Sequence, residues 1–148
     1  MKKLLFVCTG NTCRSPMASA LMNKMLQENG ITDVVADSAG IAAAEGTPAS
    51  ANAVAAAGEA GLDLSRHRSK LLSRELIEQA DRIYVMSPSH KMAIVASYPQ
   101  ARDKIVDLGG IPDPYGAGIE VYRRCRDELI QRIRPVVGQI KRRNEGKV

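Results

Sequence analysis

Two cysteines and an arginine lie close together near the start of the chain, in the stretch FVCTGNTCRSPMA from Phe6 to Ala18. Five residues separate Cys8 from Arg14, and Cys13 directly precedes the arginine. Cysteines in such a setting serve in redox pairing, in metal binding or as nucleophiles. Because the chain has only three cysteines, the surrounding residues must decide among these three chemistries.

The residues around the motif predict a strand, a tight loop and a helix. The apolar run Lys3–Cys8 is typical of a buried strand, and Pro16–Asn29 repeats apolar residues at helical spacing. We expect Ser15 to cap this helix, Pro16 to be its first residue and Gly30 to end it. A loop that leads into a helix N-terminus directs backbone N–H groups into one concavity, where the helix dipole adds positive potential. The loop is therefore predicted to bind a phosphate-like dianion.

The loop residues suit such an anion site. Gly10 and Asn11 tolerate positive φ, so we expect the backbone to fold back at this pair. Arg14 offers a planar fork that can hold two phosphate oxygens. Cys8 is expected at the floor of the loop, beside Arg14 and the Ser15 hydroxyl. Surroundings of this kind lower cysteine pKa values from about 8.5 to roughly 3.5–7.5, which favours a nucleophilic thiolate.

The alternatives to a nucleophilic cysteine have fewer matching residues. A metal site needs further ligands, but Cys125, His67 and His90 form no paired motif, so we expect no metal. A nucleotide P-loop needs Gly-Lys-Ser/Thr, whereas this chain has CRS from Cys13 to Ser15. A structural loop with two buried cysteines is the remaining alternative, although it would not need an arginine inside the turn.

Short apolar runs alternate with helical patterns along the rest of the chain. Further strands are predicted at Val34–Gly40, Arg82–Ser87 and Lys104–Leu108, and further helices at Ala49–Ala60, Ser73–Gln79, Pro88–Tyr98 and Ile119–Arg143, the last kinked or restarted by Pro135. This alternation predicts an α/β fold, a single three-layer α/β sandwich with a central four-stranded parallel sheet and helices on both faces. Ligands bind such sheets beyond the carboxyl ends of the strands, where the loop after the first strand lies.

The composition and charge of the chain indicate where the protein is located and which partners it can bind. The chain of 148 residues suffices for one domain with its own core, and its 45% hydrophobic and 25% charged residues are typical of globular proteins. The apolar run at the N-terminus is too short for a secretory signal or a membrane span, which predicts a cytoplasmic protein with reduced thiols. The net charge of +5 suits an anionic partner, but aromatic residues amount to only 3%. We therefore expect neither nucleic acid nor a membrane as partner.

The motif resembles the signature of the low-molecular-weight protein phosphatase family. That signature is a cysteine and an arginine separated by five residues and followed by serine, and DPYG at Asp113–Gly116 is similar to the family's second motif. The likeness extends over essentially the whole chain and includes DSAG at Asp37–Gly40, HRSK at His67–Lys70 and DRIYVMS at Asp81–Ser87. It implies one phosphatase domain over residues 1–148, which acts on phosphorylated protein, holds phosphate or another oxyanion in the loop and needs no cofactor.

Matched position by position, the resemblance implies roles for individual residues. Cys8 would be the nucleophile, Arg14 the clamp on the phosphate and Asp113 the general acid of a double displacement through a phosphocysteine. The phosphate-binding loop would comprise Thr9, Gly10, Asn11, Thr12, Cys13 and Ser15, with Ser38 and His67 as a supporting network and with Thr12 and Tyr115 lining the substrate. Prolines on both sides of Asp113 stiffen its backbone, so the carboxyl can be held over a leaving group at a small entropic cost.

Thr12 bears on the choice of substrate. Many tyrosine-directed members of the family carry a bulky aliphatic residue at this position, whereas CTGNTCRS and VMSPSHKMAI resemble the bacterial branch that dephosphorylates phosphoarginine. A guanidinium could meet Asp113 through a charged hydrogen bond and Tyr115 through a cation–π contact. A phosphotyrosine ring could stack on Tyr115 as well. We favour phosphoarginine and retain phosphotyrosine as the alternative.

Two further functions are weighed against a phosphatase. Arsenate reductases with the same loop use additional cysteines after the third strand, but Ser87–Asp103 contains none, and Cys125 is expected in the core. A non-catalytic phosphate-binding module is the alternative from another class. Asp113 argues against it, because a binding protein has no use for an acid aimed at the leaving group.

Overall fold

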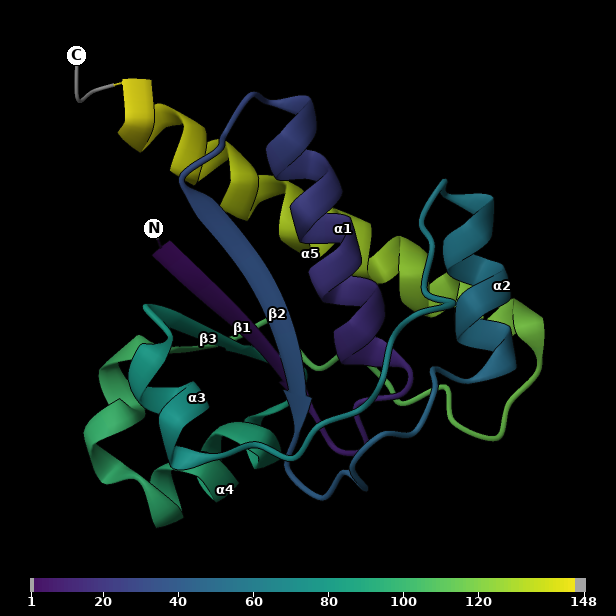
Figure 1. Cartoon of the computed structure of the whole chain (residues 1–148), viewed down its shortest axis with the longest axis horizontal. Coiled ribbons are helices and arrows are strands. Elements are labelled where there is room, and N and C mark those ends of the chain that lie inside the picture. The colour runs from purple at the N-terminus through teal and green to yellow at the C-terminus, as the bar shows by residue number, and fades with distance from the viewer. Residues whose placement is uncertain (1, 146–148) are drawn as a thin grey trace.

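The computed structural model describes residues 2–145, in which helices cover both sides of a parallel sheet (Figure 1). In chain order the elements are β1 (Lys2–Cys8), α1 (Arg14–Glu28), β2 (Val34–Gly40), α2 (Ala51–Glu59), α3 (Arg74–Gln79), β3 (Arg82–Val85), α4 (Pro88–Ser97), a 3₁₀ helix (Pro99–Lys104), β4 (Ile105–Asp107) and α5 (Ile119–Glu145). Every predicted strand and helix is present.

The four strands lie in the order β2-β1-β3-β4, and each neighbouring pair is parallel. Strand β1 is in the interior of the sheet: Cys8 at its end is opposite Gly40 of β2, and Val7 is opposite Val85 of β3. The carboxyl ends of these three strands therefore meet at one edge, directly before the loop that follows Cys8. The predicted four-stranded parallel sheet is confirmed.

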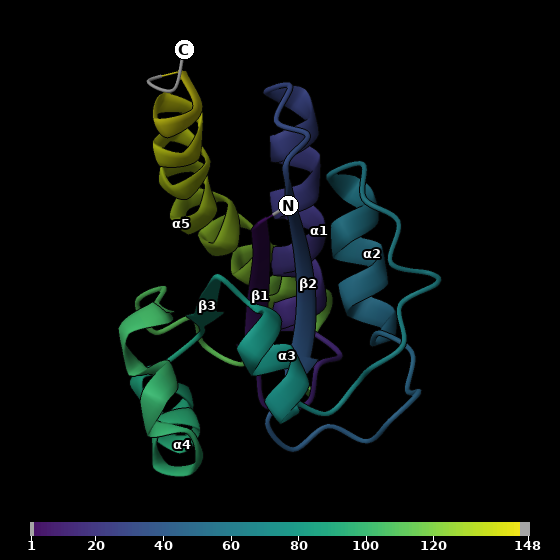
Figure 2. The same cartoon turned by 60° about the vertical axis from the view of Figure 1, so that its left-hand side comes forward.

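Alternate side chains of β1 enter two separate apolar cores, as the two-residue period of a strand requires. Leu4 and Phe6 are buried in a core shared with α1, α2 and α5, whereas Leu5 and Val7 are buried in a core shared with α3 and α4. Burial of each such side chain is worth about 1.5–3 kcal/mol, so both layers hold β1 in place. Figure 2 shows the helical layers on the two sides of the strands, which confirms the three-layer α/β sandwich.

Helix α1 begins earlier than predicted. Its first residue is Arg14 and its N-cap residue is Cys13, so the prediction of Ser15 as cap and Pro16 as first residue is wrong. The Ser15 hydroxyl contacts the sulfur of Cys8 instead of capping the helix. The early start matters for function, because it places Arg14 on the first turn, next to the loop.

Serine caps set the starts of α2 and α3. The Ser50 hydroxyl accepts a hydrogen bond from the backbone of Ala53, and the Ser73 hydroxyl accepts one from the backbone of Leu76. This contact satisfies one of the backbone N–H groups that a helix start leaves without a partner. Both helices therefore begin directly after their serine, α2 two residues and α3 one residue later than predicted.

Helix α5 is continuous through Pro135, so of the two predicted outcomes, a kink or a restart, the restart is wrong and the kink stays a prediction. Proline removes one backbone donor and crowds the preceding turn, which normally disrupts a helix. Leu129 and Ile133 before the proline and Val137 after it are buried in the same core. This shared burial holds the two halves of the helix together.

Candidate active site

The loop from Thr9 to Cys13 connects the end of β1 to the start of α1 and forms one wall of a pocket of about 300 Å³. The lining residues are Cys8, Thr9, Gly10, Asn11, Thr12, Cys13, Arg14, Asp113 and Tyr115. The structure thus brings together the residues predicted as nucleophile, clamp, acid, loop and substrate lining. The volume suits a phosphoryl group with part of the side chain that carries it.

The backbone of the loop turns at Asn11, whose φ of 58° lies in the left-handed region that asparagine tolerates. Gly10 does not have a positive φ, so the prediction for this pair is right only for Asn11. A Cβ atom on Gly40 would lie 2.6 Å from the carbonyl oxygen of Thr9 and 3.0 Å from the Asn11 nitrogen. The glycine at the end of β2 therefore lets the loop lie directly against the sheet.

Asn11 is fully buried and connects the loop to neighbouring segments. Its side-chain nitrogen donates to the hydroxyls of Ser15 at 2.8 Å and Ser38 at 2.9 Å. Its side-chain oxygen accepts from the backbone of Lys70 at 3.0 Å, and its carbonyl oxygen accepts from His67 Nε2 at 2.7 Å. Because a carbonyl can only accept, His67 carries its hydrogen on Nε2. Ser38 and His67 thus contact the residue that shapes the loop.

Cys8 lies at the floor of the pocket and is only 2% exposed. Its sulfur is 2.9 Å from the hydroxyl oxygen of Ser15, and Asn11 already donates to that oxygen. The hydroxyl hydrogen can therefore point at the sulfur; a longer contact of 3.5 Å to the Ala39 carbonyl is its other acceptor. The sulfur of Cys8 therefore lies beside a hydroxyl donor from the first turn of α1.

Arg14 is a buried cation, and one of its guanidinium nitrogens is buried without a hydrogen-bond partner. Its Nη1 donates to the Ile111 carbonyl at 3.0 Å, and its Nη2 lies 3.5 Å from Asp113 Oδ2. Its Nε is buried and has no hydrogen-bond partner. A buried donor without an acceptor costs about 1–3 kcal/mol, more when it is charged. An anion in the pocket would supply the acceptor, so the pocket is chemically suited to an oxyanion.

Asp113 and Tyr115 form the open rim of the pocket. The Asp113 side chain is 49% exposed, and its Oδ1 accepts a hydrogen bond from the backbone of Tyr115 at 3.1 Å. Together with the flanking prolines, this contact limits the motion of the carboxyl. The Tyr115 residue is 76% exposed, so its ring is free to contact a substrate side chain.

This arrangement of residues lies within a match to a known protein family. The family of low molecular weight phosphotyrosine protein phosphatases matches residues 3–145. The chain belongs to this family. It is therefore a cysteine-dependent phosphatase, and membership indicates a phosphorylated protein as substrate and phosphate as the ligand of the loop.

Individual relatives of this phosphatase carry two different names. A protein-arginine-phosphatase of Geobacillus stearothermophilus is 45% identical over 135 residues, which cover 86% of this chain and 88% of the relative. A low molecular weight protein-tyrosine-phosphatase of Acinetobacter johnsonii is 39% identical over 119 residues, with 77% and 80% covered. A solved mutant of the YwlE arginine phosphatase with a phosphorylated active-site serine is 37% identical, covers 94% of this chain and 95% of its own, and superposes with a TM-score of 0.90.

Cys13 of this phosphatase lies on the side of the loop that packs against α2 and α5. Its sulfur is 3.3 Å from the Tyr122 hydroxyl and 3.5 Å from the Ser50 hydroxyl. Burial, together with the contact to Cys13, raises the pKa of Tyr122 to about 12. Cys125 is buried in the core, as predicted, and burial raises its pKa to about 12. All three cysteines are free thiols.

Two contacts of the phosphate loop are absent from the sequence predictions. His90 on α4 has its Nε2 3.0 Å from the Thr9 hydroxyl, and the Ile111 carbonyl anchors Arg14. A backbone carbonyl leaves no signal in a sequence. His90 does have one, because it follows the carboxyl end of a parallel strand, as the loop itself does.

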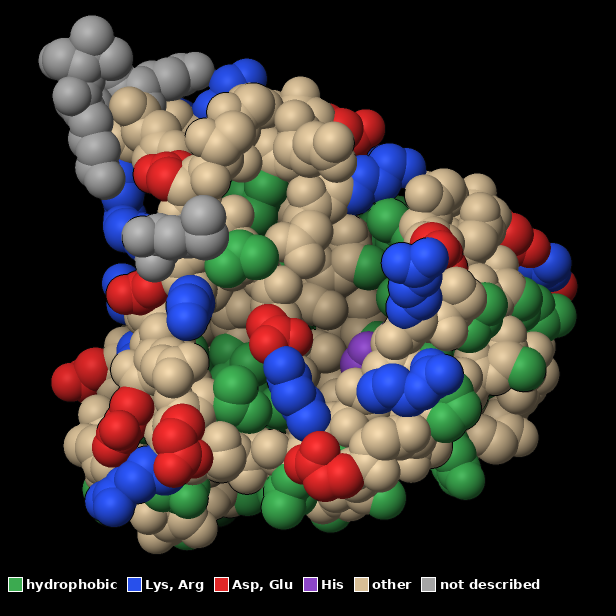
Figure 3. Space-filling view, viewed as in Figure 1, with side chains coloured by type: hydrophobic (Ala, Val, Ile, Leu, Met, Phe, Trp, Pro, Cys, Tyr) green, Lys and Arg blue, Asp and Glu red, His purple; other side chains and the backbone are tan. Residues whose placement is uncertain are grey.

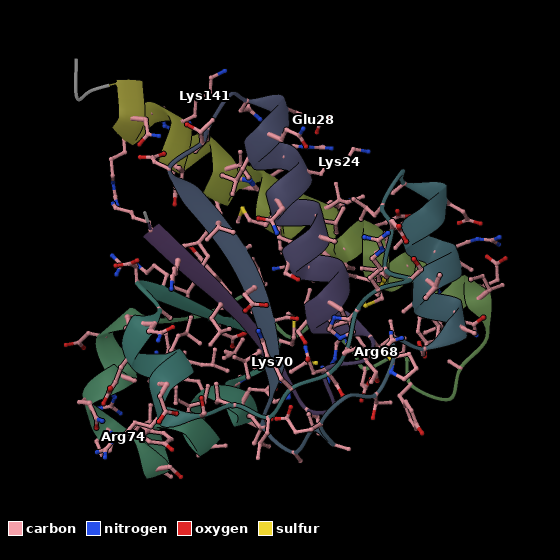
Figure 4. All side chains as sticks on the ribbon, in the orientation of Figure 1. Lys24, Glu28, Arg68, Lys70, Arg74 and Lys141 are labelled. Atoms are coloured by element: carbon pink, nitrogen blue, oxygen red, sulfur yellow. The ribbon has the colours of Figure 1, made fainter. Side chains whose placement is uncertain are left out.

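The outer surface carries mixed charge. Figure 3 shows basic and acidic side chains interspersed over one face. On that face Arg68 and Lys70 lie on the segment between α2 and α3 (Figure 4), and Lys70 forms an ion pair with Asp37 of β2. Among residues 2–145, no three His, Cys, Asp or Glu side chains lie close enough to hold a metal ion, and no helix is both long and apolar enough to cross a membrane. The cytoplasmic location stays a prediction.

Proposed function

We propose that this phosphatase removes phosphate from phosphorylated arginine side chains of proteins, through a phosphocysteine on Cys8. The observation that carries the proposal is that Arg14, whose Nε is buried without a partner, lines one pocket together with Cys8 and Asp113. A hydrogen-bond donor for the oxyanion, a nucleophile and an acid are the groups that this displacement requires. The family match over residues 3–145 supports treating residues 1–148 as one phosphatase domain.

In the first displacement the Cys8 sulfur attacks phosphorus in line with the leaving group. The S–P bond forms while the P–N bond of phosphoarginine breaks, and Asp113 gives its proton to the leaving nitrogen. The location of Asp113 on the open rim supports this role, because the leaving group must face outward when the phosphoryl group faces Cys8. General acid catalysis of this kind contributes about 10²–10⁴-fold.

The negative charge of the transferring phosphoryl group would be met by donors that are already in place. The loop from Thr9 to Cys13 precedes the N-terminus of α1, where backbone N–H groups and the helix dipole favour anions. Arg14 is held by the Ile111 carbonyl and presents its free Nε. Such preorganised donors supply most of the stabilisation in phosphoryl transfer.

In the second displacement water attacks the phosphocysteine. Asp113, now a carboxylate, takes the proton from the attacking water, and the P–S bond breaks to release phosphate. The Ser15 hydroxyl, 2.9 Å from the sulfur, would stabilise the departing thiolate. No step of this scheme uses a metal or an organic cofactor.

The preference for phosphoarginine rests on Thr12 and on the relatives. Thr12 lines the pocket with a small polar side chain where many tyrosine-directed members have a bulky aliphatic one, so more room remains beside the leaving group. The substrate guanidinium would then meet the Asp113 carboxyl and the exposed ring of Tyr115. The relative named as an arginine phosphatase is also more similar than the one named as a tyrosine phosphatase.

Phosphotyrosine is the second candidate substrate. The 76% exposure of Tyr115 leaves its ring able to stack on a phenolic leaving group as well as on a guanidinium. The same three residues would carry the reaction, with oxygen in place of nitrogen as the leaving atom. The two candidate substrates therefore differ in the contacts that they would make to the pocket rim and to Thr12, but they would react by the same two displacements.

The test compares kcat/KM on a phosphoarginine protein and a phosphotyrosine protein for the unaltered chain, Cys8→Ser and the control Cys125→Ser. We expect higher kcat/KM on phosphoarginine, no turnover by Cys8→Ser and unchanged turnover by the control. Cys8→Ser should still bind inorganic phosphate, because the loop and Arg14 remain. Activity of Cys8→Ser within tenfold of the unaltered chain would overturn the assignment of the nucleophile. Absence of turnover by the unaltered chain would favour a binding module.

Thr12→Ile tests the specificity separately. The larger side chain should lower kcat/KM for phosphoarginine more than for phosphotyrosine. Thr12→Val is the matched control, because it removes the hydroxyl at nearly constant volume. Equal losses on both substrates for Thr12→Ile would show that this position does not select between them.

A further inference from the structure

A buried histidine outside the pocket contacts the phosphate loop from α4, which covers the other face of the sheet from α1. His90 lies on the first turn of α4, is 7% exposed and does not line the pocket. Both ring nitrogens lie near hydroxyl groups: Nε2 is 3.0 Å from Thr9 Oγ1, and Nδ1 is 3.2 Å from Ser87 Oγ. Ser87 in turn lies 2.8 Å from the Ser89 hydroxyl. The imidazole therefore connects the start of α4 to the residue directly after Cys8.

Thr9 depends on this contact for its side-chain position. It is an exposed residue on the pocket wall, so no surrounding core fixes its rotamer. Its backbone is held on the side of β2, because its carbonyl accepts from the N–H of Ala42 at 3.0 Å and the Cys8 carbonyl accepts from Ile41 at 2.9 Å. The segment after β2 thus fixes one side of Thr9, and His90 fixes the other.

The position of Thr9 matters because it is covalently next to the attacking sulfur. Small displacements of a reacting atom from its in-line position have large effects on rate. Arg14, the proposed clamp on the anion, and Asn11, which shapes the loop, make these hydrogen bonds to segments other than α4. A change at His90 should therefore act on the chemical step more than on binding.

We propose that His90 is a positioning residue, which holds Thr9 and thereby keeps Cys8 aligned for attack on phosphorus. This inference rests on the proposed role of Cys8 as nucleophile. It explains why a histidine is buried between hydroxyl groups at a helix start, where an apolar residue would satisfy the packing alone. The neighbouring charged groups are Arg14, Asp113 and Asp107. Because both hydroxyl partners can donate or accept, the contact is retained in either tautomer of the neutral ring.

Two substitutions separate the contacts of the imidazole. The amide of glutamine can reach the place of Nε2, so His90→Gln keeps a partner for Thr9. The amide of asparagine reaches only the place of Nδ1, so His90→Asn keeps the Ser87 contact and loses Thr9. One hydrogen bond corresponds to roughly two- to tenfold in rate. We expect kcat of His90→Asn to fall about fivefold on p-nitrophenyl phosphate, with KM and inhibition by inorganic phosphate unchanged within about twofold, and His90→Gln to stay near the unaltered rate.

A double-mutant cycle tests whether the effect passes through Thr9. Thr9→Val removes the hydroxyl at nearly constant volume, and in that background His90→Asn should cause no further loss of kcat. Met92→Ala is the control on the same helix, because Met92 is 71% exposed and outside the pocket. It should leave kcat unchanged.

Three outcomes would contradict positioning through Thr9. They are an equal loss of kcat in His90→Gln and His90→Asn, no loss in either variant, and additive losses in the double variant. Loss of turnover in Cys8→Ser, measured in parallel, tests the proposed reaction itself. If that loss occurs and the cycle is additive, the role of His90 fails while the proposed function stands. If the unaltered chain shows no turnover, both fail.

Discussion

Arg14 Nη2 and Asp113 Oδ2 lie 3.5 Å apart at the mouth of the pocket. The guanidinium is buried and the carboxyl is half exposed, so this ion pair joins the fixed wall of the site to its open rim. Its effect is geometric, because the group that would bind the phosphate also keeps the proposed acid close to the leaving atom.

Asp113→Asn should therefore slow substrates according to their leaving groups. Asparagine can keep the turn and a contact to Arg14 but cannot donate a proton as an acid. We expect a loss of kcat of about 10²–10⁴-fold on phenyl phosphate and phosphoarginine, and a much smaller loss on p-nitrophenyl phosphate, whose leaving group needs less help. Equal losses on all three substrates would show that Asp113 has a structural role only.

Asn11→Ala and Asn11→Gly separate the backbone role of this residue from its hydrogen bonds. Both variants remove the contacts to Ser15 and Ser38, but only alanine is strained at a φ of 58°. Unsatisfied buried partners cost about 1–3 kcal/mol each, and the strain adds about 1–2 kcal/mol. We expect urea unfolding to give a clearly lower free energy of unfolding for both variants, with Asn11→Gly more stable by about 1 kcal/mol. Equal stability of the two would mean that the left-handed backbone is not a constraint.

The parts of the site that are local in sequence could be predicted from it. Cys8, the loop and Arg14 lie within one strand–loop–helix turn, so their proximity follows from chain continuity alone. The alternation of apolar runs with helical patterns also predicted the layers, and the structure buries both faces of β1 in separate cores. The approach of Asp113 to this loop was predicted only through the family resemblance, since about a hundred residues separate the two motifs.

The remaining parts depend on contacts that a sequence pattern does not encode. Ser15 looks like a helix cap, yet its hydroxyl is used by Cys8 and Asn11, and α1 begins ahead of it. The anchor of Arg14 is a main-chain carbonyl, which any residue could supply. His90 reaches the loop because β1 and β3 are neighbours, and strand order is a property of the folded sheet.

The ionisation of His90 gives a prediction that needs no substrate. Burial lowers the pKa of His90 below its ordinary value of 6.5, and Arg14 lowers it further, whereas Asp113 and Asp107 oppose the shift. We expect NMR titration to give a midpoint below 6.5, with the resonance assigned by its loss in His90→Gln. Inorganic phosphate in the loop adds negative charge and should raise the midpoint. A midpoint at or above 6.5 in the free protein would contradict the burial of a neutral ring.

The lowered pKa of His90 also determines the direction in which the free energy of unfolding changes with pH. Between pH 6.5 and the lower pKa of the folded state, the unfolded chain binds a proton at His90 that the folded chain does not bind. The contribution of the neutral imidazole to stability is therefore fully present above pH 6.5 and declines as the pH falls toward the folded pKa. Urea unfolding at several pH values should show a smaller decline in the free energy of unfolding for His90→Gln than for the unaltered chain, because glutamine does not titrate.

Cys13 is expected to protect Cys8 from irreversible oxidation. Peroxide would oxidise Cys8 to a sulfenic acid, and attack by the Cys13 thiol would then form a disulfide and release water. Both sulfurs are free thiols in the structure, and Cys13 is held by the hydroxyls of Tyr122 and Ser50, so the disulfide requires Cys13 to leave these contacts. We expect unaltered protein inactivated by peroxide to recover its activity with dithiothreitol.

Cys13→Ser should lose its activity irreversibly under the same treatment, because the sulfenic acid can then proceed to higher oxidation states. Cys125→Ser is the matched control: this third cysteine is buried in the core with a pKa of about 12, so it is neither reactive nor able to take over the role. Its recovery should equal that of the unaltered chain. Equal recovery of Cys13→Ser as well would show that Cys13 serves only to pack the loop against Tyr122, and mass spectrometry of the oxidised protein would then find no bond between the two loop cysteines.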